Sequence, residues 1–143
     1  MNAANLIHLL FQTTRAISQG VNQTLAEDGL YFSEWSMLVA LKETGQVCQS
    51  TLANYLNIEP AAISKTTIRL EEKGLVERKT GNDKREKTVL LTPKALSQYE
   101  VLEKKIALHR QSILAGLPEE KQQELAIMLR SIFSNSTKAQ GKH

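Results

Sequence analysis

One stretch of the chain, residues 60–92, constrains the fold more than any other, and it reads PAAISKTTIRLEEKGLVERKTGNDKREKTVLLT. It predicts a helix over 60–73 that ends at Gly74, then two short strands joined by a polar turn at 80–83. A helix followed directly by a charged β-hairpin is typical of a winged helix, in which the helix enters a DNA groove with the hairpin beside it. We therefore expect a mainly α fold with a small β-hairpin wing.

The helix over 60–73 has two distinct sides. At 100° per residue, Ile63, Thr67 and Leu70 fall together and predict the buried side. The other side is polar and basic in its first half, where a recognition helix contacts base edges. Hydroxyl and ammonium groups donate to bases or phosphates, and alanine methyls fit thymine methyls. The candidate base-reading residues are Ala61, Ala62, Ser64 and Lys65.

Charge is concentrated in the same region. Residues 60–94 hold nine Lys or Arg and five Asp or Glu, a net +4, whereas the whole chain carries +3. A local basic patch suits a nucleic-acid partner, but charge alone fits a solvated face equally well. The candidate phosphate contacts are Lys65, Arg69, Arg78, Lys84, Arg85 and Lys87.

The residues before this stretch supply the other half of a helix-turn-helix. Ser50 is expected to cap a short helix ending at Leu56 with Leu52, Tyr55 and Leu56 inward, and a turn at 57–59 leads to Pro60 at a first-turn position. An earlier helix is expected from an N-cap at Ser33 to about residue 44, and residues 46–48 are expected to be extended. In that earlier helix, the expected buried residues are Trp35, Leu38, Val39 and Leu41, and the expected hydrophobic staple joins Phe32 and Met37.

Long amphipathic helices are predicted at both ends of the chain. A helix over about 5–26 has apolar residues on two sides, so we expect it to pack against two partners, one of them another subunit. Thr92-Pro93 starts a helix to about residue 115, and a further helix starts near Pro118. The expected apolar stripes are Leu96, Tyr99, Leu102, Ile106 and Ile113 in the first of these and Leu125, Met128, Leu129, Ile132 and Phe133 in the second. Residues 134–143 are expected to fray.

The totals favour one domain over 1–143 and exclude several classes of protein. No apolar run is long enough to cross a bilayer, no secretory signal is evident, and the single cysteine fits a reducing cytoplasm. The enzyme motifs sought are absent, namely nucleophile elbow, phosphate loop, HExxH and dinucleotide fingerprint. We therefore predict a cytoplasmic non-enzyme with no cofactor and no membrane association.

With these elements in order, the chain resembles the multiple-antibiotic-resistance regulator (MarR) family over nearly its whole length. The most specific part is Asp83-Lys84-Arg85 followed by Leu91-Thr92, which matches the D-x-R wing of the family and the start of its next helix. Residues 69–78, RLEEKGLVER, match the exit of the recognition helix and the first wing strand. Residues 32–35, FSEW, match the start of the second helix.

The resemblance implies a homodimeric regulator of transcription. Its winged lobes, about 33–92, would bind a pseudo-palindromic double-stranded operator, and its helices at about 5–27 and 93–134 would form the dimer. Arg85 corresponds to the wing arginine of the family and Asp83 to the aspartate that orients it. Many members are repressors released by small phenolic or anionic ligands between dimer helices and lobe. The alternative is a winged-helix module that binds proteins instead of DNA.

Other candidate sites are weaker. Cys48 is expected to be a small buried hydrophobe in preference to a redox switch, since the oxidant-sensing branch places its cysteine in the first helix. His8, His109 and His143 are too far apart in sequence to suggest a metal site, and no metal is predicted. Tyr31, Trp35, Tyr55 and Tyr99 are candidates either for the core or for lining an effector pocket.

Overall fold

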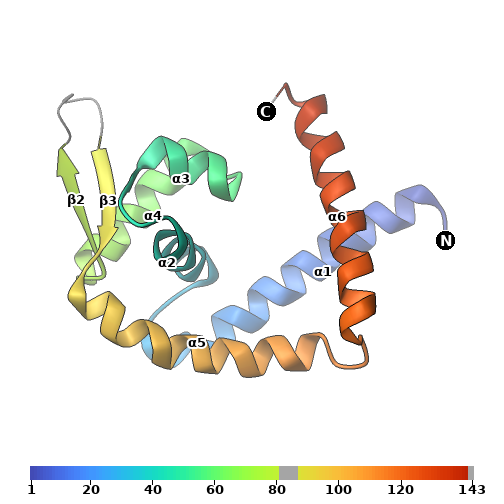
Figure 1. Ribbon diagram of the computed structural model, residues 1–143, viewed down its shortest axis with the longest axis horizontal. Helices are drawn as coiled ribbons and strands as arrows, with labels where there is room; N and C mark the ends of the chain where they lie inside the picture. Colours follow the sequence, from blue (N-terminus) through green and yellow to red (C-terminus); the bar gives the residue numbers. More distant parts are fainter. Residues whose placement is uncertain (81–86, 142–143) are drawn as a thin grey trace. The chain divides into compact units, whose positions relative to one another are not determined.

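A computed structural model describes residues 1–80 and 87–141 of the chain. Within them the order of elements is α1 (Ala3–Thr24), a 3-10 turn (Ala26–Asp28), α2 (Phe32–Thr44), β1 (Val47–Cys48), α3 (Gln49–Leu56), α4 (Pro60–Glu72), β2 (Val76–Thr80), β3 (Lys87–Leu91), α5 (Pro93–Ile113) and α6 (Glu119–Ala139) (Figure 1). The predicted fold class, mainly α with a small β-hairpin wing, is confirmed. The chain forms two compact units, residues 1–109 and 110–143.

Helices α3 and α4 form the predicted helix-turn-helix. Asn57 ends α3 in the left-handed conformation at φ 54°. Asparagine adopts this backbone conformation more readily than most residues other than glycine. Pro60 then opens α4 at its first position, where the missing N–H is not needed. The short left-handed turn thus sets the angle between the two helices.

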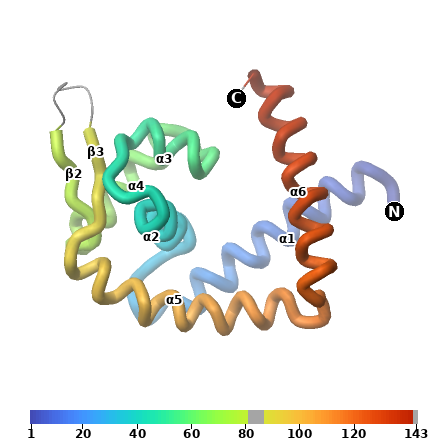
Figure 2. Tube along the Cα trace, in the orientation of Figure 1, coloured from blue at the N-terminus to red at the C-terminus, as the bar shows by residue number. Residues whose placement is uncertain are grey.

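The sheet is antiparallel with the strand order β1-β3-β2. Val76 pairs with Leu91 and Thr80 with Lys87, so β2 and β3 form the expected wing hairpin. Val47 pairs with Val89, which ties the strand before α3 to the wing. The trace in Figure 2 passes from α4 into β2 and returns along β3 into α5.

The core of the first unit lies where α2, α3 and α4 meet the sheet (Figure 1). Ile63, Thr67 and Leu70 are buried, as the helical spacing in α4 predicted. Trp35 of α2 is buried and stacks on Tyr99 of α5, with ring centroids 5.1 Å apart. These contacts place the outer face of α4 away from the core.

Both predicted serine caps are wrong. The N-cap of α2 is Tyr31, whose backbone N–H donates to Glu34 Oε1 at 2.9 Å, so Ser33 lies inside the helix and Phe32 and Met37 do not occupy the staple positions that a Ser33 cap would give them. The N-cap of α3 is Cys48, and the Ser50 hydroxyl contacts the Cys48 sulfur instead. In each case the helix begins earlier than a serine cap requires.

Some expected inward residues are at the surface. Tyr55 is exposed and Ala53 takes its place inside α3, while Leu96 and Ile113 of α5 are exposed as well. Helix α1 exposes Leu6, Ile7, Leu9 and Phe11, which agrees with a helix that is apolar on two sides. Only its C-terminal end, at Val21, is buried in the described part of the chain.

The unit of residues 110–143 consists mainly of α6. Glu119 and Glu120 lie in its first turn, where the positive end of the helix dipole favours acids. The helix continues to Ala139. The expectation that the chain frays from residue 134 is therefore wrong for residues 134–139. Its apolar stripe is exposed at Leu125, Met128, Leu129 and Phe133. No described helix is long and apolar enough to cross a membrane.

Candidate nucleic-acid interface

Helix α4 presents the predicted reading surface. Ala61, Ala62 and Lys65 in its first half are exposed, and Ser64 is half-buried. All four therefore lie on or beside the side opposite Ile63 and Leu70, as the sequence spacing predicted. Two methyls, a hydroxyl and an ammonium group are the chemistry that meets base edges and phosphates in a major groove.

Arg69 lies further along the exposed side of α4. Its Nη2 is 3.3 Å from Thr66 Oγ1 and 3.5 Å from Ser33 Oγ, so it donates to hydroxyls of α4 and α2. Both contacts are long, and neither partner is charged. The guanidinium therefore keeps its positive charge uncompensated by these contacts, at the surface where a phosphate would add to them.

Arg78 is placed differently from the other expected phosphate contacts. Its Nε and Nη2 donate to Glu71 Oε2 and Oε1 at 3.1 and 2.8 Å, a bidentate pair between β2 and the last turn of α4. Hydrogen bonds from Arg78 hold the pKa of the Glu71 carboxyl below its usual range, and the same bonds raise the pKa of Arg78. Lys87, at the start of β3, is exposed.

The remaining expected contacts, Asp83, Lys84 and Arg85, lie outside the described residues. Their neighbours in the chain, Thr80 and Lys87, are paired across the hairpin. The assignment of Asp83 and Arg85 to a wing clamp therefore stays a prediction.

A buried ion pair fixes the end of α4 and was missed by sequence reasoning. Lys73, the C-cap of α4, donates to the carboxylate of Glu34, whose side chain is 0% exposed, and to the carbonyl oxygen of Gly29 at 2.7 Å. Glu34 thus accepts from Lys73 and from the Tyr31 N–H together. The only sequence signal was an acid at the third position of α2, which suits a capping box and carries no hint of its distant partner.

Thr92 joins the wing to the same helix end. Its hydroxyl donates to the carbonyl of Gly74 at 2.7 Å and accepts from the N–H of Ala95, which makes it the predicted cap of α5. Lys94 donates to the carbonyl of Lys73 at 2.9 Å. Gly74, at φ 75°, makes the turn between α4 and β2. The end of α4, the wing and the start of α5 are therefore held as one block.

Cys48 is half-exposed and lies outside the hydrophobic core, so the expectation that it is a buried hydrophobe is wrong. The hydroxyls of Ser50 and Thr51 lie 3.1 and 3.0 Å from its sulfur. Donation by Ser50 first, and by Thr51, lowers the pKa of the thiol to about 7. In the described residues no cluster of three His, Cys, Asp or Glu could hold a metal ion.

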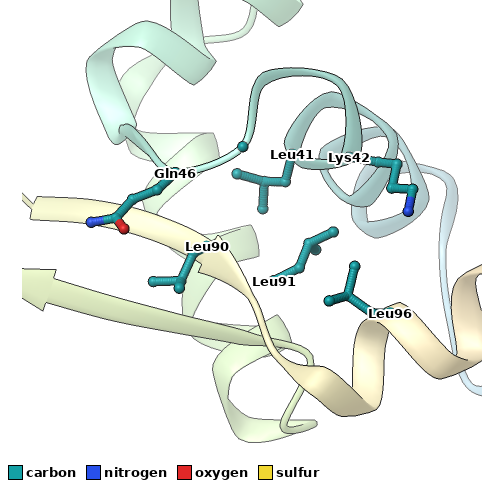
Figure 3. A pocket seen from close by; sticks show the side chains of 7 residues that line it. Leu41, Lys42, Gln46, Leu90, Leu91 and Leu96 are labelled. Carbon is teal, nitrogen blue, oxygen red and sulfur yellow. The ribbon is translucent and has the colours of Figure 1, made fainter.

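An open, mostly apolar pocket of about 290 Å³ lies where α2 and β3 meet the start of α5. Figure 3 shows Leu41, Leu91 and Leu96 turned toward a shared space, with Lys42 at its edge. The Lys42 ammonium also lies 5.5 Å from the centre of the Tyr99 ring. Of the four aromatic candidates, Trp35 belongs to the core and Tyr99 packs against it, while Tyr31 and Tyr55 are exposed.

Comparisons with known proteins agree with this arrangement. The model of the MarR family matches residues 30–87. YwoH of Bacillus subtilis, described as an uncharacterized HTH-type transcriptional regulator, is 37% identical over 126 residues, which cover 88% of this chain and 92% of that protein.

Solved structures share the fold. A MarR protein from Peptoclostridium difficile superposes with a TM-score of 0.88 at 20% identity, covering 97% of this chain and 92% of the other. BpsR of Bordetella bronchiseptica, described with a mechanism for regulation of its DNA binding by 6-hydroxynicotinic acid, has a TM-score of 0.82 at 22% identity and covers 90% of this chain and 98% of its own. Together with the match to YwoH, these findings show that the chain belongs to the MarR family of winged helix-turn-helix transcriptional regulators.

Proposed function

We propose that the protein is a homodimeric repressor that binds a pseudo-palindromic double-stranded DNA operator and is released from it by a small-molecule effector. The observation that carries the proposal is the outer face of α4, where Ala61, Ala62 and Lys65 are exposed beside the wing. A two-fold dimer would place two such helices in successive major grooves, about 34 Å apart.

The contacts divide by chemistry. Ala61, Ala62, Ser64 and Lys65 would face base edges, because they occupy the first half of α4. Arg69 and Lys87, with Lys84 and Arg85 from the wing tip, would bind phosphates or a minor groove. In the family's pattern Asp83 holds Arg85. We expect Arg85→Ala to weaken operator binding without unfolding the protein.

The exposed apolar faces of α1 and α6 support the dimer. Phe11 is 59% exposed and Phe133 54% exposed in the single chain, and a soluble protein rarely leaves such stripes uncovered. We propose that a second copy covers them. Sedimentation equilibrium of the full chain would measure the dimer, and a monomer at micromolar concentration would contradict it.

We propose that the open pocket beside α5 binds the effector. Its wall is leucine-rich and Lys42 supplies one positive charge at the edge, which suits a small aromatic acid. BpsR, a structural neighbour, is described as regulated by such a molecule. A ligand bound there would push α2 and β3 apart from the start of α5. Lys42→Gln should raise the concentration of an aromatic carboxylate needed to release DNA, while operator affinity without ligand stays unchanged.

The test of DNA binding is selection of bound sequences from a random duplex pool. Enrichment of a two-fold site, with affinity that falls steeply with salt, would support the proposal. Equal binding to every duplex, or none, would favour the alternative of a protein-interaction module.

A further inference from the structure

The pair Glu71–Arg78 joins the recognition helix to the wing. Glu71 lies in the last turn of α4 and Arg78 in β2, with the turn at Gly74 between them. Two parallel N–H···O bonds, at 2.8 and 3.1 Å, fix the plane of the guanidinium against the carboxylate. A bidentate pair fixes orientation as well as distance, unlike a lysine contact.

The surroundings of the pair favour a connection within the protein. Lys87, the first residue of β3, adds a smaller electrostatic effect that also lowers the pKa of Glu71. The carboxylate thus interacts with both strands of the hairpin. Arg78 itself pairs with Val89 in the sheet register, so its backbone is held by the hairpin while its side chain reaches α4.

We propose that Glu71 and Arg78 are positioning residues for DNA binding, which set the angle of the wing relative to α4 so that both reach one stretch of duplex. The inference rests on the proposed function. It differs from the expectation, drawn from charge alone, that Arg78 is a phosphate contact. Two of its donors already bind Glu71, and their loss would loosen the hairpin against α4 before any DNA is present.

Electrostatics alone and positioning predict opposite changes in DNA affinity for the same substitution of Glu71. Glu71→Gln removes a negative charge beside a DNA-binding face, so electrostatics alone predicts tighter binding. Positioning predicts binding weaker by roughly three- to tenfold, because the wing must then be ordered on association. Glu72→Gln is the matched control, since Glu72 is an exposed acid one residue away on the same helix. It should bind as tightly as the wild type or more tightly.

Arg78→Lys gives a second contrast. The substitution keeps the positive charge and removes the bidentate hydrogen bonding. Positioning therefore predicts a loss of DNA affinity similar to that of Glu71→Gln, whereas a phosphate contact predicts little change in affinity. The double variant Glu71→Gln/Arg78→Lys should bind no more weakly than either single variant, because both remove the same connection.

The experiment measures operator affinity of the full chain at fixed salt, together with amide hydrogen exchange of β2 and β3 without DNA. We expect weaker binding and faster exchange in Glu71→Gln and Arg78→Lys, and neither in Glu72→Gln. Wild-type affinity in Glu71→Gln, tighter binding, or unchanged exchange would overturn the inference alone. A wild-type chain that binds no duplex would overturn the proposed function, and the inference with it.

Discussion

Replacing Lys73 by methionine tests whether the end of α4 depends on the buried ion pair. Methionine keeps most of the aliphatic stem and removes the ammonium group, so among the described residues Glu34 keeps its bond from the Tyr31 N–H alone. The carbonyl of Gly29 loses its donor as well. Since the Glu34 side chain is fully buried, the variant leaves an uncompensated charge inside the protein.

The expected cost follows from that burial. Removing one partner of a buried pair costs about 3–5 kcal/mol of unfolding free energy, far more than the loss of an exposed pair, which is about 0–1 kcal/mol. Lys73 is itself 34% exposed, which places the expectation near the lower end, at about 3 kcal/mol. At roughly 2–4 °C per kcal/mol for a chain of this length, the midpoint temperature of thermal unfolding should fall by about 6–12 °C.

The assays are urea unfolding for the free energy and thermal unfolding for the midpoint temperature, both followed by circular dichroism at one protein concentration because dimerisation adds to apparent stability. Lys65→Met, an exposed lysine on the same helix, is the control and should change stability by less than about 0.5 kcal/mol. The double variant Glu34→Gln/Lys73→Met should recover much of the loss, since no charge stays buried. A loss in Lys73→Met no larger than the control, or a double variant no better than the single one, would refute the reasoning.

Three further outcomes follow from single contacts. Alkylation of Cys48 should rise with a midpoint near pH 7, because hydroxyls stabilise the thiolate, and Ser50→Ala should move the midpoint toward 9; identical midpoints would contradict that cause. A Cβ on Gly20 would lie 2.3 Å from His109 Nε2, so Gly20→Ala must displace the imidazole. In thermal melts it should therefore stabilise the wild-type chain less than a His109→Ala background, where the helix-propensity gain of up to about 1 kcal/mol appears in full; equal effects in both backgrounds would contradict the contact. Lys65→Gln should change base preference at one operator position by roughly 1–3 kcal/mol in competition assays, and a uniform loss over all positions would make Lys65 a phosphate contact.

The fold was predictable where local patterns and tertiary packing agree. Ile63, Thr67 and Leu70 repeat at helical spacing and Pro60 and Gly74 bound the helix, so α4 was placed to within a residue. The serine caps of α2 and α3 were not predictable, because a serine near a helix start suits several positions. Whether a given serine is the cap depends on where the preceding strand or loop ends, because that decides which residue begins the helix.

The site was only partly predictable for the same reason. The exposed residues of α4 follow from periodicity alone. The ion pairs Glu34–Lys73 and Glu71–Arg78 depend on how the elements pack. The sequence alone does not indicate which acid pairs with which base. Arg78 therefore looked like any other basic residue of the wing, and Cys48 like a core residue.

The central claim is that the outer face of α4 and the wing bind a specific duplex. Its most direct measurement is the affinity of the full chain for its selected two-fold operator and for a scrambled duplex, over a series of salt concentrations. The claim predicts a linear fall of log affinity with log salt, by about 0.9 per neutralised phosphate, and a preference for the operator of roughly a thousandfold or more. A flat salt dependence, or equal affinity for both duplexes, would contradict it.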